Sequence, residues 1–535
     1  MLERAVNYEP LTPLSFLRRS TFVFPDKIAV IYRDKRYTYS EFNARVNRLA
    51  SALQRAGIRK GDKVAFMCPN TPPMLEAHYG VALAGAVLVS INIRLSSQEI
   101  AYIVNHSDTK ILFVDYEFAG VIEPVINELT NVKLMVNIND EVGEKRLPGP
   151  EYEEFLATGS PEDIEIPVQD ELENITINYT SGTTGLPKGV MYSHRNAYLN
   201  ALGACVEHGI NTKSVYLWTL PMFHCNGWCF TWAVTAAGGT HICLRKVIPE
   251  DIFRVIQEEG VTLLCAAPTV LISMSNFPGA KDMQLKVPLR VVTGGAPPAP
   301  TVIENMEKIG AEVVHVYGLT EVYGPHTICE WQDKWNDLPF EEKAKIKARQ
   351  GVAYITAVHV KVVDSEMNEV PHDGQTMGEI VMRGNNVMLG YYKQPEATEE
   401  AFRGGWFHSG DVAVVHPDGY IEIKDRMKDV IVSGGENIST VEVENVIYQH
   451  PEVMEVAVIA VPDEKWGEVP KAFVVPKPGT SPTAEDIINF CRERIARFKC
   501  PKQVEFGDLP KTATGKIQKY VLREREWRGR EKRVN

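Results

Sequence analysis

The sequence contains no long uninterrupted hydrophobic run. Its most apolar stretch, residues 79–93, is interrupted by small and polar residues and falls short of the roughly 20 residues that span a bilayer. Glu3, Arg4, Glu9 and Pro10 precede any apolar segment, unlike a secretory signal. The final Arg-Val-Asn differs from a peroxisomal tripeptide. We therefore expect a cytoplasmic protein without a transmembrane segment.

Paired cysteines and an excess of basic charge are also missing. Nine cysteines among 535 residues form no CxxC pair, which argues against a disulfide framework or a zinc knuckle. The 57 Lys and Arg residues are outnumbered by 69 Asp and Glu residues, which gives a formal net charge of −12. Because no overall basic field exists, we expect no nucleic-acid partner, and an anionic substrate must meet local positive groups.

Helical and strand patterns alternate over the first 350 residues. Residues 37–56 have helical spacing behind a Ser40 cap, residues 63–69 form an apolar strand, and residues 73–87 form a second helix pattern. Further apolar strands, such as residues 289–295, continue the alternation. This order predicts parallel sheets with flanking helices.

The pattern changes near residue 352, where short strands separated by Gly, Asp and Asn turns indicate a β-rich, antiparallel region. Residues 330–350 resemble a surface insertion with a helical end. We predict an α/β fold with a large N-terminal domain, residues 1–427, that includes a β-rich subdomain at about 352–427. A small, mobile α+β domain follows at residues 428–535, with its own apolar faces.

A loop rich in glycine and hydroxyl groups, YTSGTTGLPKG at residues 179–189, follows an alternating strand pattern. Glycines let a loop approach a ligand closely, hydroxyls donate hydrogen bonds, and Lys188 supplies a positive charge. The loop is not a Walker loop, because Lys188 lies between Pro187 and Gly189. We interpret it as a polyphosphate-binding loop, with a flexible polar surface loop as the alternative.

With this loop, the sequence resembles the adenylate-forming superfamily of acyl-CoA synthetases, luciferases and peptide-synthetase adenylation domains. Further motifs of the family occur in its order along nearly the whole chain. They are PMFHCNGW (221–228), GGAPP (294–298), YGLTE (317–321), WFHSGD (406–411), KDRMKDVIVSGGENIS (424–439) and PKTATGKI (510–517). Residues 330–351 and NNVMLGYY (385–392) are similar to the branch acting on short- and medium-chain or aromatic monocarboxylates.

The resemblance implies a nucleotide site and a Mg²⁺ site. YGLTE follows an apolar strand, at the strand end where open α/β sheets bind ligands. Tyr317 offers a flat face to adenine, Thr320 a hydroxyl to the α-phosphate, and Glu321, with Thr184, an oxygen ligand to Mg²⁺. The residues implied in ATP and AMP binding are Thr180, Ser181, Gly182, Thr183, Thr184, Gly185, Lys188, Gly295, Ala296, Pro297, Tyr317, Gly318, Thr320, Asp411, Arg426 and Lys516.

Three charged residues complete the implied nucleotide chemistry. Asp411 suits the two ribose hydroxyls, and Arg426 can reach ribose or phosphate. Lys516 resembles the family's catalytic lysine, which bridges the carboxylate and the α-phosphate in the transition state. We expect Lys516, Thr320 and Glu321 to be catalytic. The alternative for Lys516 is one more solvated lysine in a basic tail.

The acyl pocket is expected to include His224, Cys225, Trp228 and Gly294. His224 follows Phe223 at the position where amino-acid-activating relatives carry an aspartate for the substrate amine. An acid without an amine is therefore preferred. A structural role for His224, and a core role for Trp228, are the alternatives.

The resemblance implies that the small domain rotates between two half-reactions, so that a different face of this domain covers the site in each. The hinge is expected at Lys428, and the CoA tunnel at Ser433, Gly434, Gly435 and Glu436. A side chain at Gly435 would block the tunnel. The same residues also fit an ordinary hairpin turn, which is compatible with the tunnel.

The resemblance implies an AMP-forming carboxylate–CoA ligase with ATP and CoA as co-substrates and Mg²⁺ as cofactor. The expected acid is a short- or medium-chain fatty acid, and a benzoate-like acid is the alternative. Transfer to a carrier-protein thiol and light-emitting oxidation are further alternatives. A non-catalytic sensor would be expected to lack Lys516 or Glu321, and both are present. A homodimer is a common outcome in the family.

Overall fold

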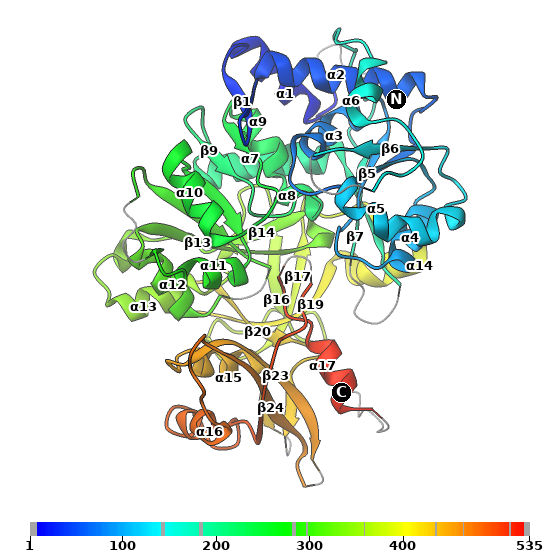
Figure 1. Cartoon of the computed structure of the whole chain (residues 1–535). Coiled ribbons are helices and arrows are strands. Elements are labelled where there is room, and N and C mark those ends of the chain that lie inside the picture. Colours follow the sequence, from blue (N-terminus) through cyan, green and yellow to red (C-terminus); the bar gives the residue numbers. More distant parts are fainter. Residues whose placement is uncertain are drawn as a thin grey trace.

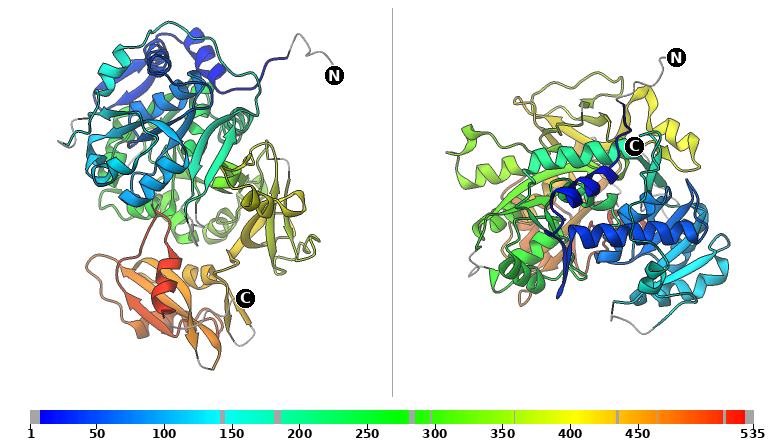
Figure 2. Two further views of the ribbon diagram at one scale, coloured as in Figure 1. Left: turned by 90° about the vertical axis from the view of Figure 1, so that its right-hand side faces the viewer. Right: turned by 90° about the horizontal axis from the view of Figure 1, so that it is seen from above.

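The computed structural model describes residues 8–140, 145–180, 186–280, 285–295, 298–357, 359–433, 436–463, 465–512 and 515–528. A large body of sheets and helices lies above a smaller C-terminal unit, which contains the strands and helices that follow β20 (Ile421–Arg426) (Figure 1). Figure 2 shows the same two parts from the side and from above. The predicted α/β fold, with a large N-terminal part and a small C-terminal part, is confirmed.

The body contains two large, mainly parallel sheets. The first has the order β18-β8-β7-β4-β3-β5-β6, and its β8 and β18 edge is antiparallel. Its strands are β3 (Lys63–Met67), β4 (Val87–Ser90), β5 (Thr109–Asp115), β6 (Leu134–Ile138), β7 (Asn174–Tyr179), β8 (Gly189–Ser193) and β18 (Gly390–Tyr391). The phosphate-loop motif therefore connects two neighbouring strands, β7 and β8.

The second sheet has the order β15-β14-β13-β12-β11-β9-β10-β1-β2, with parallel pairing from β13 through β1. Its strands are β1 (Ile28–Tyr32), β2 (Lys35–Thr38), β9 (Val215–Leu217), β10 (Thr240–Ile242), β11 (Leu263–Ala266), β12 (Leu289–Thr293), β13 (Ala311–Leu319), β14 (Gly324–Ile328) and β15 (Val352–Ala353). The YGLTE motif ends β13, and GGAPP follows β12. Both motifs thus lie at carboxyl ends of adjacent strands, as the sequence predicts.

Helices cover these sheets and fill the space between them. They are α1 (Leu14–Val23), α2 (Tyr39–Arg55), α3 (Pro72–Leu83), α4 (Ser97–His106), α5 (Ala119–Ile122), α6 (Tyr152–Ala157), α7 (His194–His208), α8 (Cys225–Trp228), α9 (Phe230–Ala236), α10 (Pro249–Glu259), α11 (Pro268–Ser275), α12 (Pro300–Lys308), α13 (Phe340–Lys347) and α14 (Pro395–Ala401). Short 3₁₀ turns lie at η1 (Tyr116–Phe118), η2 (Glu123–Glu128), η4 (Thr320–Val322), η5 (Asp333–Trp335) and η6 (Arg403–Gly405).

One predicted helix cap is wrong. Helix α2 begins at Tyr39, and its cap is Thr38, whose hydroxyl accepts from the Glu41 amide while Glu41 accepts from the Thr38 amide. In such a reciprocal capping box, the side chain three positions after the cap, most often Glu or Gln, accepts from the amide of the cap residue. Glu41 stands at that distance from Thr38, whereas Asn43 follows Ser40, so the helix starts one position before Ser40.

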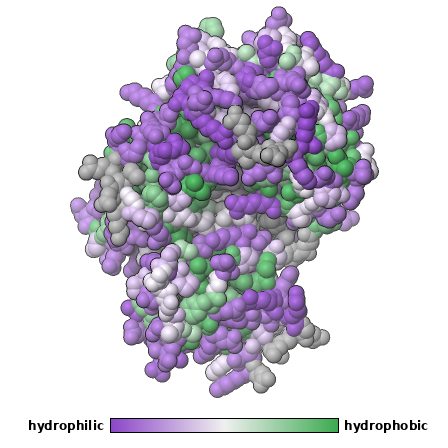
Figure 3. All heavy atoms as spheres, in the orientation of Figure 1, coloured by the Kyte–Doolittle hydropathy of each residue, from purple (hydrophilic) through white to green (hydrophobic). Residues whose placement is uncertain are grey.

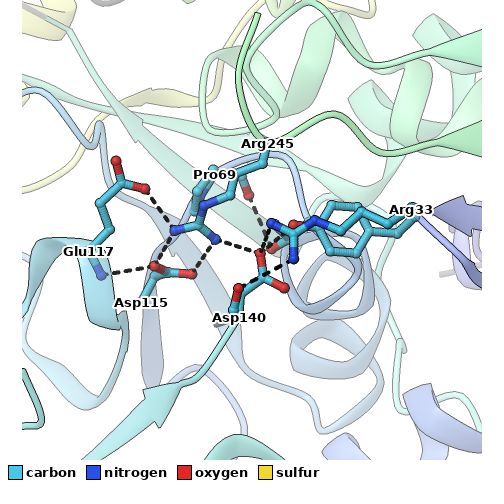
Figure 4. Close-up of polar contacts among 8 residues, drawn as sticks. Arg33, Pro69, Asp115, Glu117, Asp140 and Arg245 are labelled. Carbon is cyan, nitrogen blue, oxygen red and sulfur yellow. Dashed lines mark hydrogen bonds and ion pairs between the residues drawn. The ribbon is translucent and has the colours of Figure 1, made fainter. Parts of the chain in front are cut away.

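An ion network joins the two large sheets of the body (Figure 4). Arg245, which follows β10, lies 2.6 Å from Asp115 Oδ1 at the end of β5 and 2.7 Å from Asp140 Oδ2 just after β6. It also reaches Glu117 at 2.7 Å. The Arg245 side chain is 5% exposed, and burial raises the pKa of Asp115 against the opposing effect of Arg245. This buried network fixes one sheet to the other.

The β-rich region forms a four-stranded antiparallel sheet of order β16-β17-β19-β20. Its strands are β16 (His359–Val363), β17 (Gly378–Arg383), β19 (Phe407–Val415) and β20 (Ile421–Arg426). Two short strands from the same stretch, β15 and β18, instead extend the two large sheets. The region is therefore tied to the body at several points.

The C-terminal unit is a sheet between two apolar clusters. Its strands are β21 (Ile431–Ser433), β22 (Glu436–Ile438), β23 (Val453–Asp463), β24 (Gly467–Pro476) and β25 (Gln503–Phe506), and its helices are α15 (Thr440–Ile447), α16 (Ala484–Arg492) and α17 (Lys519–Glu526). Helices α15 and α16 cover one cluster, and α17 contributes to the other.

The outer surface is largely polar in the view of Figure 3, with hydrophobic residues scattered among hydrophilic ones. Across the described ranges, no helix combines the length and the apolar character needed to cross a membrane.

Candidate active site

The residues predicted to bind adenine and ribose come together in the structure. Tyr317, at the end of β13, donates its hydroxyl to Asp411 Oδ2 at 2.7 Å. Asp411 faces Arg426 across the β19–β20 ladder, and the Arg426 Nε atom lies 3.2 Å from Asp411 Oδ1. Burial, and then Asp411, raise the pKa of Tyr317 well above its ordinary value. These three side chains form a compact polar cluster, as predicted.

Ser409 supports this cluster through the main chain. Its hydroxyl accepts from the Asp411 amide at 3.1 Å and donates to the Ile380 carbonyl at 2.6 Å. The hydroxyl thus holds the turn that presents Asp411.

Glu321 and Thr320 occupy the 3₁₀ turn that follows β13. Glu321 Oε1 accepts from the Tyr391 hydroxyl at 2.9 Å, and the Glu321 carbonyl accepts from the Met388 amide at 2.8 Å. The Thr320 carbonyl accepts from the Tyr192 hydroxyl at 2.5 Å. The turn is therefore fixed from two other segments of the body.

Gly318 is required by the strand pairing itself. A Cβ on Gly318 would lie 1.7 Å from the carbonyl oxygen of Gly324, on the neighbouring strand β14. Since no side chain fits at that distance, glycine is needed here for the backbone of β13 to approach β14. Gly295, in the turn after β12, is exposed and has a φ of +85°.

The two ends of the predicted phosphate loop lie side by side. The Thr180 amide donates to the Lys188 carbonyl at 3.0 Å, which continues the β7–β8 ladder. The Lys188 ammonium lies 4.6 Å from the centre of the Tyr391 ring. Several predicted site residues fall outside the described residues, namely Ser181, Gly182, Thr183, Thr184, Gly185, Ala296, Pro297, Gly434 and Gly435.

The segment predicted to line the acyl pocket has an unusual backbone. Residues 225–229 all have positive φ, from 46° at Cys225 to 65° at Cys229, and only Gly227 among them is a glycine. A left-handed conformation costs roughly 1–2 kcal/mol for each non-glycine residue. Such strain persists only where the surroundings impose it, and it concentrates at functional sites.

Trp228 is wedged between two glycines. A Cβ on Gly294 would lie 3.1 Å from the Trp228 ring, and a Cβ on Gly324 would lie 3.1 Å from the Trp228 Cα. The structure thus brings together Trp228 and Gly294, two of the predicted pocket residues. This close packing involves Trp228, one of the five residues with a left-handed backbone.

His224 and Cys225 lie at the start of this segment. Burial, and then the charge of Lys516, lower the pKa of His224 to about 4, so its imidazole is neutral at pH 7. Burial raises the pKa of the Cys225 thiol to about 12, so Cys225 is not a thiolate nucleophile. The two side chains give the segment a neutral polar surface.

Lys516 reaches this site from the C-terminal unit. Desolvation, followed by the nearby Arg426, lowers the pKa of Lys516 to about 7, while Asp411 opposes the shift. Lys516 is partly buried near these charged groups, which favours a place at the site over a solvated tail lysine, and its catalytic role stays a prediction. Lys516 lies within electrostatic range of both the ribose cluster and His224.

Two contacts seat the Lys516 turn on the body. Arg94 Nη1 donates to the Thr512 carbonyl at 3.4 Å. Gly515 has a φ of +82°, and a Cβ there would lie 2.2 Å from Thr269 Oγ1 at the start of α11. The turn therefore approaches α11 as closely as glycine allows.

The described residues of the predicted CoA tunnel form a hairpin. Ser433 is buried and pairs with the exposed Glu436 between β21 and β22, and Ser433 also pairs with Gly467. Lys428 is exposed between β20 and β21, at the passage from the body to the C-terminal unit.

Four side chains at the site were not found from the sequence: Tyr192, Tyr391, Arg94 and Thr269. Of these four residues, only Tyr391 could have been found from the sequence, because it belongs to the segment NNVMLGYY that supports the family resemblance. The other three meet the site through contacts between distant segments.

The fold and this site define a nucleotide-dependent enzyme in which a separate C-terminal unit carries Lys516, the predicted catalytic lysine. The family model described as AMP-binding enzyme matches residues 17–392, and the model described as AMP-binding enzyme C-terminal domain matches residues 442–516. The chain belongs to the AMP-binding enzyme family, the adenylate-forming superfamily that its motifs resemble.

Curated relatives narrow the class further. The chain is 50% identical to 4-hydroxybutyrate–CoA ligase 2 of Metallosphaera sedula over 96% of this chain and 94% of that protein. It is 48% identical to a peroxisomal acetate/butyrate–CoA ligase of Arabidopsis thaliana over 97% and 95%. A solved anthranilate CoA ligase, with 24% identity and a TM-score of 0.88 over 98% and 99% of the two chains, has the same fold. The predicted class, an AMP-forming acid–thiol ligase, is supported.

Proposed function

We propose that this chain joins a short- or medium-chain fatty acid to CoA, with cleavage of ATP to AMP and diphosphate. The observation that carries the proposal is the position of Lys516, between the Asp411–Arg426 pair and the His224 segment. A cation at that place lies between a nucleotide site and a neutral pocket for an acid. Two relatives are named as ligases of 4-hydroxybutyrate and of acetate or butyrate, and these names support this acid class.

In the first half-reaction, a carboxylate oxygen of the acid attacks the α-phosphorus of ATP, and the bond to diphosphate breaks. Asp411 accepts from the ribose hydroxyls, and Tyr317 offers its ring to adenine. Protonated Lys516 stabilises the negative charge that builds up between the carboxylate and the α-phosphate. The product is an acyl-adenylate, which needs no covalent bond to the enzyme.

Mg²⁺ fits the residues at this site. Among the residues that the structure describes, no group of three or more His, Cys, Asp or Glu side chains could hold a metal ion. Mg²⁺ is commonly held by one or two carboxylates together with substrate phosphates, and Glu321 supplies one carboxylate beside the phosphate loop. Thr184 is the second proposed ligand. When bound, the ion neutralises phosphate charge.

In the second half-reaction, the CoA thiol attacks the carbonyl carbon of the acyl-adenylate, and AMP leaves. We propose that residues 428–535 rotate about Lys428 against residues 1–427, so that Lys516 withdraws and the hairpin of Ser433 and Glu436 borders a CoA tunnel. Gly434 and Gly435 belong to the same proposed tunnel. A homodimer and a cytoplasmic location stay predictions from the sequence.

A bounded acyl pocket agrees with a small acid. The Trp228 ring fills the space beside Gly294, and the two neutral side chains of His224 and Cys225 follow. These groups offer no charged partner to an amine or to a second carboxylate. An unbranched monocarboxylate, with or without a terminal hydroxyl, suits such a pocket.

The test is a measurement of AMP release with ATP, CoA and a panel of acids: acetate through octanoate, 4-hydroxybutyrate and benzoate. We expect CoA-dependent AMP release to be fastest with an aliphatic acid of eight carbons or fewer. AMP release with benzoate alone would contradict the proposed acid. Release that needs a carrier-protein thiol in place of CoA would contradict the proposed acceptor.

A further inference from the structure

Tyr391 contacts two parts of the site that come from distant segments. Its hydroxyl donates to Glu321 Oε1 at 2.9 Å, and its ring face lies 4.6 Å from the Lys188 ammonium. Glu321 follows β13, whereas Lys188 precedes β8. The side chain is 7% exposed, so both contacts form in partly desolvated surroundings.

We propose that Tyr391 is a positioning residue that orients the Glu321 carboxylate and the Lys188 ammonium toward the triphosphate and its metal ion. This inference rests on the proposed function, because it assumes a nucleotide at the site. Tyr391 itself contacts neither the acid nor the reacting phosphorus in this account. It acts through two charged side chains that do contact the nucleotide.

The backbone around Tyr391 is held on both sides. Its strand, β18, pairs with β8, and the Leu389 amide donates to the Met191 carbonyl at 2.9 Å. The Met388 amide donates to the Glu321 carbonyl at 2.8 Å, and the Tyr391 amide donates to Thr398 Oγ1 at 2.9 Å. The short strand therefore links the end of the phosphate loop to the Glu321 turn.

The chemistry of the phenol suits a fixed donor. A tyrosine hydroxyl ionises only near pH 10, so at neutral pH it is a hydrogen-bond donor. A donor on one carboxylate oxygen of Glu321 fixes the rotation of that carboxylate and directs the other oxygen toward a cation.

The ring of Tyr391 has a separate effect on Lys188. A lysine side chain has a flexible four-carbon stem, and ordering it costs conformational entropy. Attraction between an ammonium and an aromatic face restricts the stem before the nucleotide arrives. Hydroxyl and ring therefore orient different partners, and substitutions can separate the two effects.

Three variants test the proposal: Tyr391→Phe, Tyr391→Leu and the control Tyr392→Phe. The control removes the same hydroxyl one residue later, where it donates to Asp108 at 3.0 Å, away from Glu321 and Lys188. Acid-dependent exchange of diphosphate into ATP is measured against the concentration of Mg·ATP. Binding of ATP without acid is measured by calorimetry, with and without Mg²⁺, and thermal unfolding verifies the fold.

For Tyr391→Phe, we expect a loss of about 10-fold in the exchange rate constant with little change in KM for ATP, because one hydrogen bond to a charged group is removed. The advantage of Mg²⁺ in ATP binding should shrink as well. For Tyr391→Leu, we expect a further rise of about fivefold in KM, since Lys188 loses the ring face. Tyr392→Phe should match the wild type, and all three unfolding midpoints should lie close together.

A double-mutant cycle with Glu321→Gln separates positioning from packing. If Tyr391 acts through Glu321, Tyr391→Phe should cost much less in the Glu321→Gln background than in the wild type. Equal costs in both backgrounds, or a Tyr391→Phe variant with wild-type exchange and Mg²⁺-dependent binding, would overturn the inference. Failure of the wild type to release AMP with any acid would overturn the proposed function instead, while calorimetry would still report on Tyr391.

Discussion

Two interfaces of this molecule differ in kind. Inside the body, the nearly fully buried Arg245 side chain forms ion pairs with Asp115 and Asp140, which lie at the ends of two adjacent strands of the neighbouring sheet. The ion-pair distances are 2.6 and 2.7 Å. Between the body and the Lys516 turn, the described contacts include one hydrogen bond of 3.4 Å from Arg94 and the close approach of Gly515 to Thr269. The first interface is charged and buried, whereas these residues of the second are exposed or only partly buried.

The contacts near the proposed hinge are intermediate between those of the two interfaces. Asp425, at the end of β20, accepts from the Thr440 amide at 2.6 Å and from the Thr440 hydroxyl at 2.8 Å, at the start of α15. These bonds hold the C-terminal unit close to the proposed pivot at Lys428. Tyr448 and Met454 of the C-terminal unit also pack against an apolar cluster of the body. We propose that the Arg245 network is a permanent interface and that the seat of the Lys516 turn is a reversible one.

Removal of the charge at the permanent interface should have the largest effect on stability. We expect Arg245→Met to lower the free energy of unfolding by about 3–5 kcal/mol, because the buried Asp115 carboxylate would lose the charge of Arg245, whereas Asp140 keeps its contacts with Arg33 and Tyr32. Urea denaturation measures this change. The matched control is Arg254→Met, whose exposed pairs with Asp251 and Glu258 should contribute less than about 1 kcal/mol. Equal losses in both variants would contradict a special role for the network.

A change at the reversible interface should affect one half-reaction rather than stability. Gly515→Ala places a methyl group against Thr269 at a φ that L-residues rarely adopt. We expect adenylate formation to fall by about 10-fold or more, with thioester formation from supplied acyl-adenylate nearly unchanged. Thr269→Ala removes the clashing oxygen, so the double variant should recover part of the rate. An equal loss in both half-reactions would argue against a reversible seat.

The pH dependence of adenylate formation should sharpen the role of Lys516 at the same interface. With a pKa of about 7, Lys516 is mostly protonated below pH 7 and loses its charge above it. The kcat/KM for diphosphate exchange should therefore fall about tenfold per pH unit above about pH 7. Lys516→Arg keeps its charge and should show no such fall. A profile shared by both enzymes would assign the titration to another group.

Much of the fold could be predicted from the sequence, because its periodicity is strong. The alternation of apolar strands and helices predicted the parallel sheets with flanking helices that the structure contains. Helix α2 shows where local reasoning fails. Thr38 and Ser40 both carry a hydroxyl near the start of this helix. The reciprocal bond with Glu41, rather than the position of the first apolar residue, makes Thr38 the cap.

At the site, motif residues could be predicted, whereas their supports could not. Tyr317, Asp411 and Arg426 meet as expected, but the partners Tyr391 and Glu321 are 70 residues apart and no periodicity relates them. The left-handed backbone at residues 225–229 had no local signal either, because four of the five residues are not glycine. Within that segment, Trp228 packs against Gly294 and Gly324, which are distant in the sequence.

The central claim is that Lys516 serves the first half-reaction from a unit that then moves away. Rates of both half-reactions in Lys516→Ala test it most directly, with diphosphate exchange for the first and thioester formation from supplied acyl-adenylate for the second. We expect the first rate to fall by about 100-fold or more, as for the loss of one group that stabilises transition-state charge, and the second to change little. Equal loss in both half-reactions would contradict the account.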